Sequence, residues 1–171
     1  MNCAIKLLAQ STFEDGNYYA MVAPFFVSAA HPLYSVSGVY NAIFVKGSQI
    51  GDVMFYGSGA GKLPTACAVV ADIVDAAKHI DKHIYTFWSK EDLELAGIES
   101  ATRRFFVRVS GDRAATEDKI AKEFGTVEYI SAEGVSGEFG FVTGPLTEKS
   151  FDAHLKNIPR VISSIRLESR I

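Results

Sequence analysis

Cysteine is scarce in this chain of 171 residues, which contains only Cys3 and Cys67. Two cysteines are too few for the disulfide framework that stabilises many small secreted domains. We therefore expect a reducing, cytoplasmic environment. Because no histidine base lies near Cys67 in the sequence, we expect this residue to be a small buried apolar side chain rather than a nucleophile.

The chain also lacks an excess of basic charge and lacks long apolar runs. It has 17 Lys and Arg against 20 Asp and Glu, which gives a formal net charge of −3. This balance argues against a nucleic-acid partner. No apolar run approaches the roughly 20 residues needed to span a bilayer, and nothing at the N-terminus is typical of a secretory signal, so we expect no membrane partner. Hydrophobic residues still make up 48% of the chain, enough for the cores of two small domains.

The most informative segment is a glycine-rich run, Gly57 to Gly61, which leads into an amphipathic pattern. A helix is expected from about Pro64 to Ile80, because proline suits the first turn of a helix and the apolar residues recur with helical spacing. These apolar residues are Ala66, Val69, Val70, Ile73, Val74, Ala77 and Ile80. Glycine lets backbone amides approach a ligand closely, and a helix N-terminus carries partial positive charge. The run could therefore receive a phosphate.

Two known glycine motifs do not fit this run. The phosphate loop of nucleotide hydrolases needs a glycine where Tyr56 stands and a Ser or Thr where Leu63 stands. The dinucleotide fingerprint GxGxxG needs a second parallel strand after the helix, and the sequence there becomes a charged connector. Spacing alone therefore leaves two alternatives open, a tight structural turn without a ligand and a phosphate-binding turn.

Residues 1–56 are rich in Val, Ile, Phe and Tyr with turn signals between short runs. Strands are expected over residues 4–13, 18–27, 40–45 and 50–56, and the short loops predict an antiparallel meander. One face of such a sheet needs a second layer, which the helix after Pro64 cannot supply in full. We expect an exposed apolar patch or self-association as a homo-oligomer.

Residues 81–100 are charged and are expected to connect two domains, at 1–80 and 101–171. Beyond the connector the pattern is βαββαβ, with Phe105, Val107 and Val109 on one face of the first strand. Thr116 to Phe124 is expected to form a helix, and strands over 126–132 and 138–143 form a hairpin. A helical stripe of Phe151, Leu155 and Ile158 and an alternating strand of Val161, Ile165 and Leu167 follow. This is the ferredoxin-like order of elements, so the fold class is α+β.

The histidines do not predict a metal centre. His79 and His83 have the spacing of metal ligands on a helix, but no third ligand is evident. We expect them to interact with the exposed carbonyls at the helix C-terminus. His31, before Pro32, is expected to order a turn, and His154 to be exposed to solvent.

Three segments together are similar to the end of the catalytic region of homoserine dehydrogenase. They are AIKLLAQ (residues 4–10), HPLYSVSGVYNAIFVKG (31–47) and IGDVMFYGSGAGKLPTACAVVADIVDAA (50–77). The HPL, NAIF and GxGAGxxPTA elements occur in the order and spacing of that family. From about Ala101 onward the chain resembles the regulatory ACT domain that many bacterial members carry.

The resemblance implies a C-terminal portion of an NAD- or NADP-dependent oxidoreductase that interconverts aspartate semialdehyde and homoserine, on the route to threonine and methionine. The glycine that ends the GxGAG run in this family contacts the cofactor, which implies cofactor-binding roles for Gly61 and, beside it, Gly59. The Rossmann domain and the residues that hold substrate and relay the proton belong to segments upstream of these. We therefore expect no catalytic residues in this chain and no activity from it alone.

The resemblance also implies an effector, threonine, near the loop after the first ACT strand. In this chain that loop, residues 111–116, reads GDRAAT and lacks the Asp-x-Pro-Gly typical of ACT domains. Effector binding and pure subunit assembly therefore both stay open. An alternative for the whole chain is a non-enzymatic ACT regulator whose N-terminal sheet is a dimerisation platform.

Overall fold

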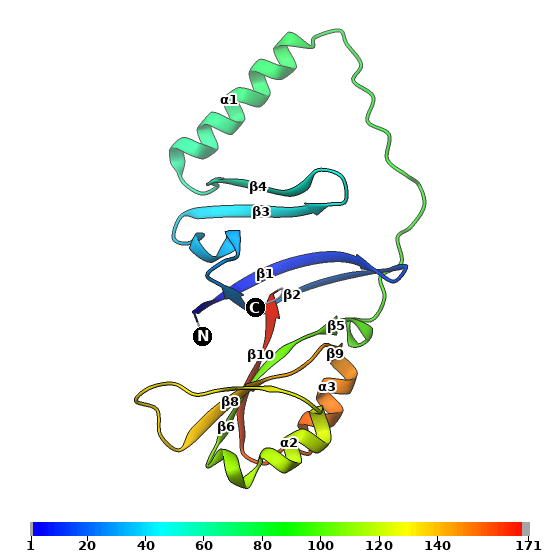
Figure 1. Ribbon diagram of the computed structural model, residues 1–171. Coiled ribbons are helices and arrows are strands. Elements are labelled where there is room, and N and C mark those ends of the chain that lie inside the picture. The colour runs from blue at the N-terminus through cyan, green and yellow to red at the C-terminus, as the bar shows by residue number, and fades with distance from the viewer. Residues whose placement is uncertain (1, 169–171) are drawn as a thin grey trace. The chain divides into compact units, whose positions relative to one another are not determined.

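The structure is a computed structural model that describes residues 2–168 (Figure 1). It combines β-sheets with three α-helices among these residues. The contacts divide the chain into two compact units. Unit 1 consists of Met1–Ser28 together with Leu93–Ile171, and unit 2 consists of Ala29–Asp92.

Unit 1 is built on a six-stranded sheet in the order β1-β2-β10-β6-β8-β7. Its strands are β1 (Cys3–Glu14), β2 (Asn17–Ser28), β6 (Phe105–Ser110), β7 (Glu128–Ile130), β8 (Glu138–Val142) and β10 (Val161–Glu168). Neighbouring strands are antiparallel except β2 and β10, which run parallel. The N-terminal hairpin therefore extends the sheet that the C-terminal strands form.

The core of unit 1 lies between this sheet and two helices, α2 (Glu117–Phe124) and α3 (Glu148–Leu155). Its buried members are Phe105, Val107, Val109, Ile120, Phe139, Phe141, Phe151 and Ile158. Phe105 and Phe151 stack with ring centroids 3.7 Å apart. Four short elements complete the unit: η2 (Ile98–Ser100), β5 (Thr102–Arg103), η3 (Arg113–Ala115) and β9 (Leu146–Thr147).

The predicted order of strands and helices after residue 101 agrees with the observed elements. Phe105, Val107 and Val109 all point into the core, as the alternation predicts. The last strand differs, because an irregularity between Val161 and Ser163 shifts its register against β6. Val161 therefore packs against the core, while Ile165 pairs with Phe106 on the opposite face. The prediction that the apolar residues of this strand share one face was wrong.

Unit 2 contains η1 (Pro32–Ser35), β3 (Tyr40–Gly47), β4 (Gly51–Ser58) and α1 (Lys62–Lys78). Strands β3 and β4 form an antiparallel hairpin, closed where Gly51 turns the chain with a φ of 76°. No residue between 29 and 92 is buried, and α1 has its apolar side chains in solvent. Ile43, Phe55, Leu63 and Ile73 are each more than 60% exposed.

Two expectations about the N-terminal half need correction, those for its sheet and for Cys67, and the domain limits stay a prediction. The four strands lie in two sheets rather than one meander, because β2 pairs with β10 while β3 and β4 pair only with each other. Residues 1–28 group with 93–171, which the domain limits 1–80 and 101–171 did not anticipate; those limits stay a proposal. Cys67 is exposed rather than buried, like the rest of its helix, and neither cysteine forms a disulfide.

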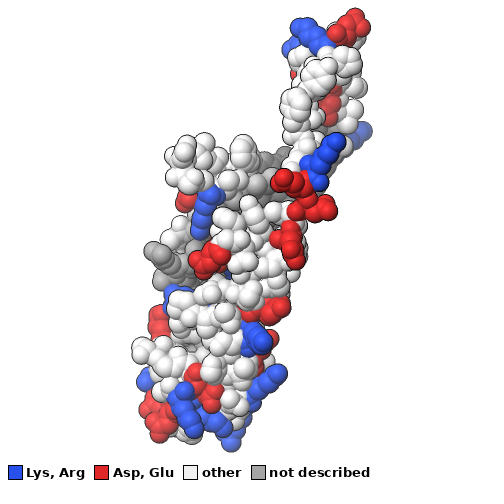
Figure 2. Space-filling view, turned by 90° about the vertical axis from the view of Figure 1, so that its right-hand side faces the viewer, with Lys and Arg blue, Asp and Glu red and all other residues white. Residues whose placement is uncertain are grey.

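The surface carries both signs of charge. On the face shown in Figure 2, acidic and basic side chains lie interspersed, with broad uncharged areas between them. None of the helices among residues 2–168 is long and apolar enough to cross a membrane.

Candidate functional site

The glycine-rich run of unit 2 lies between β4 and α1, and the family resemblance implies that it contacts a cofactor. Gly61 is the N-cap of α1 and has φ 123° and ψ 157°, a backbone conformation that only glycine adopts readily. Its carbonyl accepts the first hydrogen bond of the helix, from the Thr65 amide at 3.1 Å. Helical hydrogen bonding begins with the amide of Thr65. The missing N–H of Pro64, one residue earlier, therefore removes no helical hydrogen bond. The helix begins two residues before Pro64 and ends two before Ile80.

Two of the three glycines of the run have a structural reason to be glycine. A Cβ at Gly59 would lie 2.7 Å from Nδ2 of Asn41, so the side chain of Asn41 occupies that space. At Gly61 a Cβ would meet only Pro64 at 3.5 Å, and the positive φ is the constraint. At Gly57 a Cβ would meet nothing within 4 Å. Asn41 was not among the predicted site residues, and its place in the NAIF element was the available signal.

The electrostatics at the start of α1 favour an anion. The N-cap makes no side-chain hydrogen bond, and the first turn contains no acidic residue. Among residues 2–168 no side chain of the N-cap residue caps the first amides of the helix, and the dipole adds partial positive charge there. Lys62 begins the helix with a full positive charge. A phosphate-bearing group fits this arrangement.

The histidines have structural surroundings. Nδ1 of His31 accepts the Leu33 amide at 3.1 Å, which confirms the expected role in a turn. His79 caps α1 with Nδ1 2.9 Å from the Asp75 carbonyl, as expected for a helix C-terminus. His83 lies beyond the end of α1, so the two side chains do not share a helical face. His154 contacts Glu123 at 3.0 Å, a partner that the sequence spacing did not reveal. No cluster of metal ligands occurs among the residues that the structure describes.

The loop predicted to receive an effector, residues 111–116, uses some of its polar groups in hydrogen bonds within the chain, although residues 112–115 are exposed. Oδ1 of Asp112 accepts the Ala114 amide at 3.2 Å, and the Gly111 amide donates to the Gly137 carbonyl at 2.7 Å. Arg113 lies over the ring of Tyr129 at 3.9 Å and donates to Glu117 at 2.9 Å. This arginine lowers the pKa of Tyr129, but burial outweighs it and raises that pKa.

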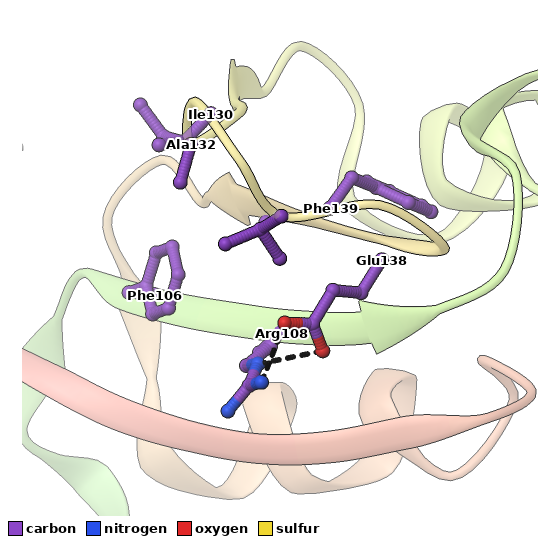
Figure 3. Close-up of a pocket in the computed structure, with 8 residues that line it drawn as sticks. Phe106, Arg108, Ile130, Ala132, Glu138 and Phe139 are labelled. Atoms are coloured by element: carbon purple, nitrogen blue, oxygen red, sulfur yellow. Dashed lines mark hydrogen bonds and ion pairs between the residues drawn. The ribbon is translucent and has the colours of Figure 1, made fainter.

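A pocket of about 240 Å³ lies beside the β6–β8 pair of unit 1 (Figure 3). Its lining is mostly apolar and includes Phe106, Ile130 and Val135. At its edge Arg108 donates to both carboxylate oxygens of Glu138, at 2.9 and 2.5 Å. The hydrogen bond to Glu138 raises the pKa of Arg108. The two charged groups hydrogen-bond to each other, so they add no specific contact for a ligand. An apolar ligand would be held in this pocket by its fit to the apolar lining alone.

Comparison with known sequences shows where similarity lies. The family profile for homoserine dehydrogenase matches residues 1–74, a span that contains the glycine-rich run and most of α1. A homoserine dehydrogenase from Lactococcus lactis is 34% identical over 139 residues, covering 78% of this chain. One from Synechocystis is 35% identical over 147 residues, covering 82% of this chain. Each alignment covers 31% of the relative, so the chain spans about a third of the length of these proteins.

Comparison with solved structures extends the similarity to nearly the whole chain. A crystal structure of Staphylococcus aureus homoserine dehydrogenase at pH 6.0 matches 99% of this chain with a TM-score of 0.72 and 28% sequence identity. The match covers 43% of that protein. A homoserine dehydrogenase structure from Thiobacillus denitrificans has a TM-score of 0.74 at 24% identity, a likeness of fold.

Proposed function

Because this chain belongs to the homoserine dehydrogenase family, we propose that it forms the C-terminal part of an enzyme that interconverts aspartate semialdehyde and homoserine with NAD or NADP. Such a reaction serves the biosynthesis of threonine and methionine. The observation that carries the proposal is the Gly61 turn, which lies within the span matched by the family profile. Cytoplasmic location follows from the same proposal.

We assign Gly61, with Gly59 beside it, to contact with the nicotinamide cofactor. The uncapped amides at the start of α1 support this assignment, because they can meet an anionic group without a side chain between them. The close approach of Asn41 to Gly59 supports it too, since it fixes the path of the backbone before Gly61. When bound, the cofactor accepts or returns the hydride. The residues of this chain would hold it in place, and none of them would relay the proton.

The C-terminal part of unit 1 is proposed to be an ACT domain. Support comes from the order β6-α2-β7-β8-α3-β10 and from the neighbours β10-β6-β8-β7, which are those of a ferredoxin-like sheet. Its role would be regulation by threonine or assembly into a homodimer. The hydrogen bonds that Asp112 and Gly111 make within the chain favour assembly, because they leave fewer groups of the loop to meet a ligand.

A second candidate function is a non-enzymatic ACT regulator that dimerises through its N-terminal strands. The pairing of β2 with β10 favours it, because the hairpin and the C-terminal strands form one sheet. Ile5, Leu7 and Val22 also expose apolar side chains on this hairpin.

The two functions can be separated by activity. We would join the upstream part of the Lactococcus lactis homoserine dehydrogenase to this chain and follow NADP reduction with homoserine as substrate. The proposal predicts that this chimera is active and that the 171-residue chain alone is inactive. A folded chimera without activity, or turnover by the chain alone, would contradict it. A chimera that lacks the last 70 residues is the control. If it retains activity, the ACT domain is purely regulatory.

A further inference from the structure

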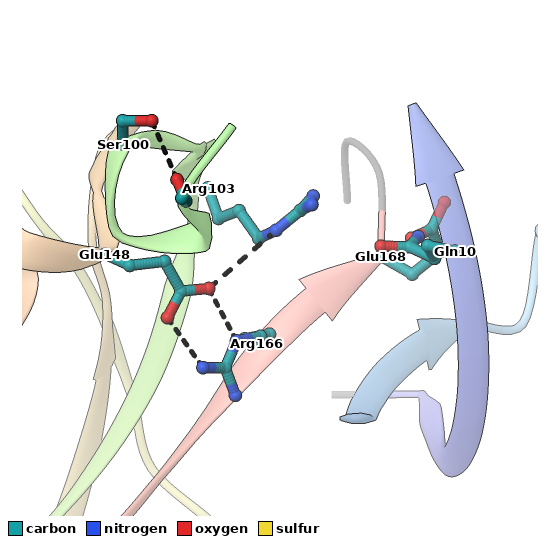
Figure 4. Close-up of polar contacts among 7 residues, drawn as sticks. Gln10, Ser100, Arg103, Glu148, Arg166 and Glu168 are labelled. Carbon is teal, nitrogen blue, oxygen red and sulfur yellow. Dashed lines mark hydrogen bonds and ion pairs between the residues drawn. The ribbon is translucent and has the colours of Figure 1, made fainter. Parts of the chain in front are cut away.

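A nearly buried cluster of one carboxylate and two arginines lies in unit 1, outside the glycine-rich site (Figure 4). Glu148 begins α3, Arg166 is on β10 and Arg103 is on β5. The side chain of Glu148 is 8% exposed and that of Arg103 is 9% exposed. The side chain of Arg166 is 29% exposed. Two cations therefore face one anion, and of the two cations Arg103 is the one largely removed from water.

Both carboxylate oxygens of Glu148 accept a hydrogen bond from Arg166. Arg166 donates from Nε and Nη2 to the two oxygens of Glu148, each at 2.6 Å. This is the paired geometry that makes guanidinium–carboxylate bonds strong. Nε of Arg103 lies 3.8 Å from the nearer oxygen, beyond hydrogen-bonding distance.

Arg103 differs from its neighbours in this respect. Nε of Arg108 and Nε of Arg113 each donate to a carboxylate at 2.9 Å, and Nε of Arg104 donates to the Thr143 carbonyl at 3.1 Å. Nε of Arg103 is buried and has no hydrogen-bond partner among the described residues. Its guanidinium contacts the face of Phe25 at 5.9 Å, and Figure 4 shows the tip turned away from Glu148.

We propose that Arg103 binds a carboxylate group supplied from outside this cluster. The guanidinium presents a planar fork of donors that matches a carboxylate, and a buried donor without a partner is costly. The excess of one positive charge is balanced by one carboxylate, whereas a phosphate dianion would overcompensate it. The carboxylate comes either from a small molecule or from an acidic side chain of a second copy of this chain. The proposal does not depend on the proposed dehydrogenase function.

The test follows the Nε–H resonance of Arg103 by NMR in the 171-residue chain, assigned by its loss in Arg103→Lys. Sodium acetate is titrated against sodium chloride at equal ionic strength. A saturable shift with acetate alone identifies a small carboxylate. If the Nε–H resonance instead shifts when the protein is diluted, the carboxylate comes from a second copy of the chain. A resonance that responds to neither overturns the proposal.

A stability measurement gives an independent readout. At ten times its Kd, acetate should raise the thermal midpoint by about 3–5 °C in the unmodified chain and in Arg113→Met, a matched control at an exposed arginine. The same addition should leave Arg103→Met unchanged. For a second copy, the midpoint should instead rise with protein concentration and lose that dependence in Arg103→Met. Equal responses of Arg103→Met and Arg113→Met in both series would contradict the proposal.

Discussion

The two units of this chain bury their apolar residues very differently. In unit 1, Phe25, Val107 and Phe141 are completely buried. In unit 2, every residue from 29 to 92 is at least partly exposed, including the apolar residues of a 17-residue helix. The sequence of unit 1 thus specifies a core of its own. The apolar residues of unit 2 form surfaces that its own elements leave uncovered.

Helices from the two units show the same contrast. The eight residues of α2 bury Ile120 and pack Phe124 against the core. The longer α1 carries Val69, Ile73 and Val74 at helical spacing and buries none of them. An amphipathic pattern therefore predicts a helix, but not which surface covers it.

The largest change in stability is expected from a substitution in the core, compared with one at an exposed position. Phe141→Ala should destabilise unit 1 by about 3–5 kcal/mol, because it leaves a cavity among packed rings. Ile73→Ala, at a side chain that is 62% exposed, should change stability by no more than about 0.5 kcal/mol. Urea denaturation of the chain, followed by circular dichroism, measures both. Similar losses in the two variants would show that α1 is packed in solution and would remove the contrast.

The smallest expected effect concerns pH and lies within unit 1. Glu123 accepts hydrogen bonds from Asn157 at 2.9 Å and His154 at 3.0 Å, and these lower its pKa below the ordinary 4.5. A carboxylate with a lowered pKa adds stability above its unfolded pKa, and that stability is lost as the pH falls through the folded pKa. At pH values below 4.5 the thermal midpoint should therefore decrease by a small amount.

The matched variants for this prediction are Glu123→Gln and Glu133→Gln, the second in an exposed loop. Glu123→Gln should flatten the decline in the thermal midpoint at acid pH, and Glu133→Gln should leave it unchanged. Because the side chain of Glu123 is only partly buried and that of His154 is 40% exposed, the effect should be small. An identical acid profile in both variants would mean that the contacts of Glu123 contribute nothing to the pH dependence.

Local patterns predicted much of this fold. Period-two alternation identified β6, and helical spacing with Pro64 identified α1 within two residues at each end. Pairing between distant segments was not predictable in the same way. Nothing in the local pattern of β2 indicates that β10 will lie beside it, because any apolar strand offers the same backbone hydrogen bonds. The irregularity after Val161 likewise reversed the facing of Ile165 and Leu167 without a sequence signal.

The candidate sites divide along the same line. The glycine run marked a turn, and the structure gives Gly61 its φ of 123°, but the space that Asn41 takes beside Gly59 depends on the β3–β4 register. The cluster of Arg103, Glu148 and Arg166 was not predicted. Its members come from three separate elements, and only the tertiary structure brings them together.

We propose that the Gly61 turn of unit 2 contacts the nicotinamide cofactor, and substitution of Gly61 in the chimera measures whether it does. Gly61→Ala places a side chain where φ is 123°, whereas the control Gly57→Ala meets nothing within 4 Å. We expect Gly61→Ala to raise the KM for NADP by about tenfold or more while the KM for homoserine stays constant, and Gly57→Ala to change neither. An unchanged KM for NADP in Gly61→Ala, or an equal rise in both KM values, would contradict it.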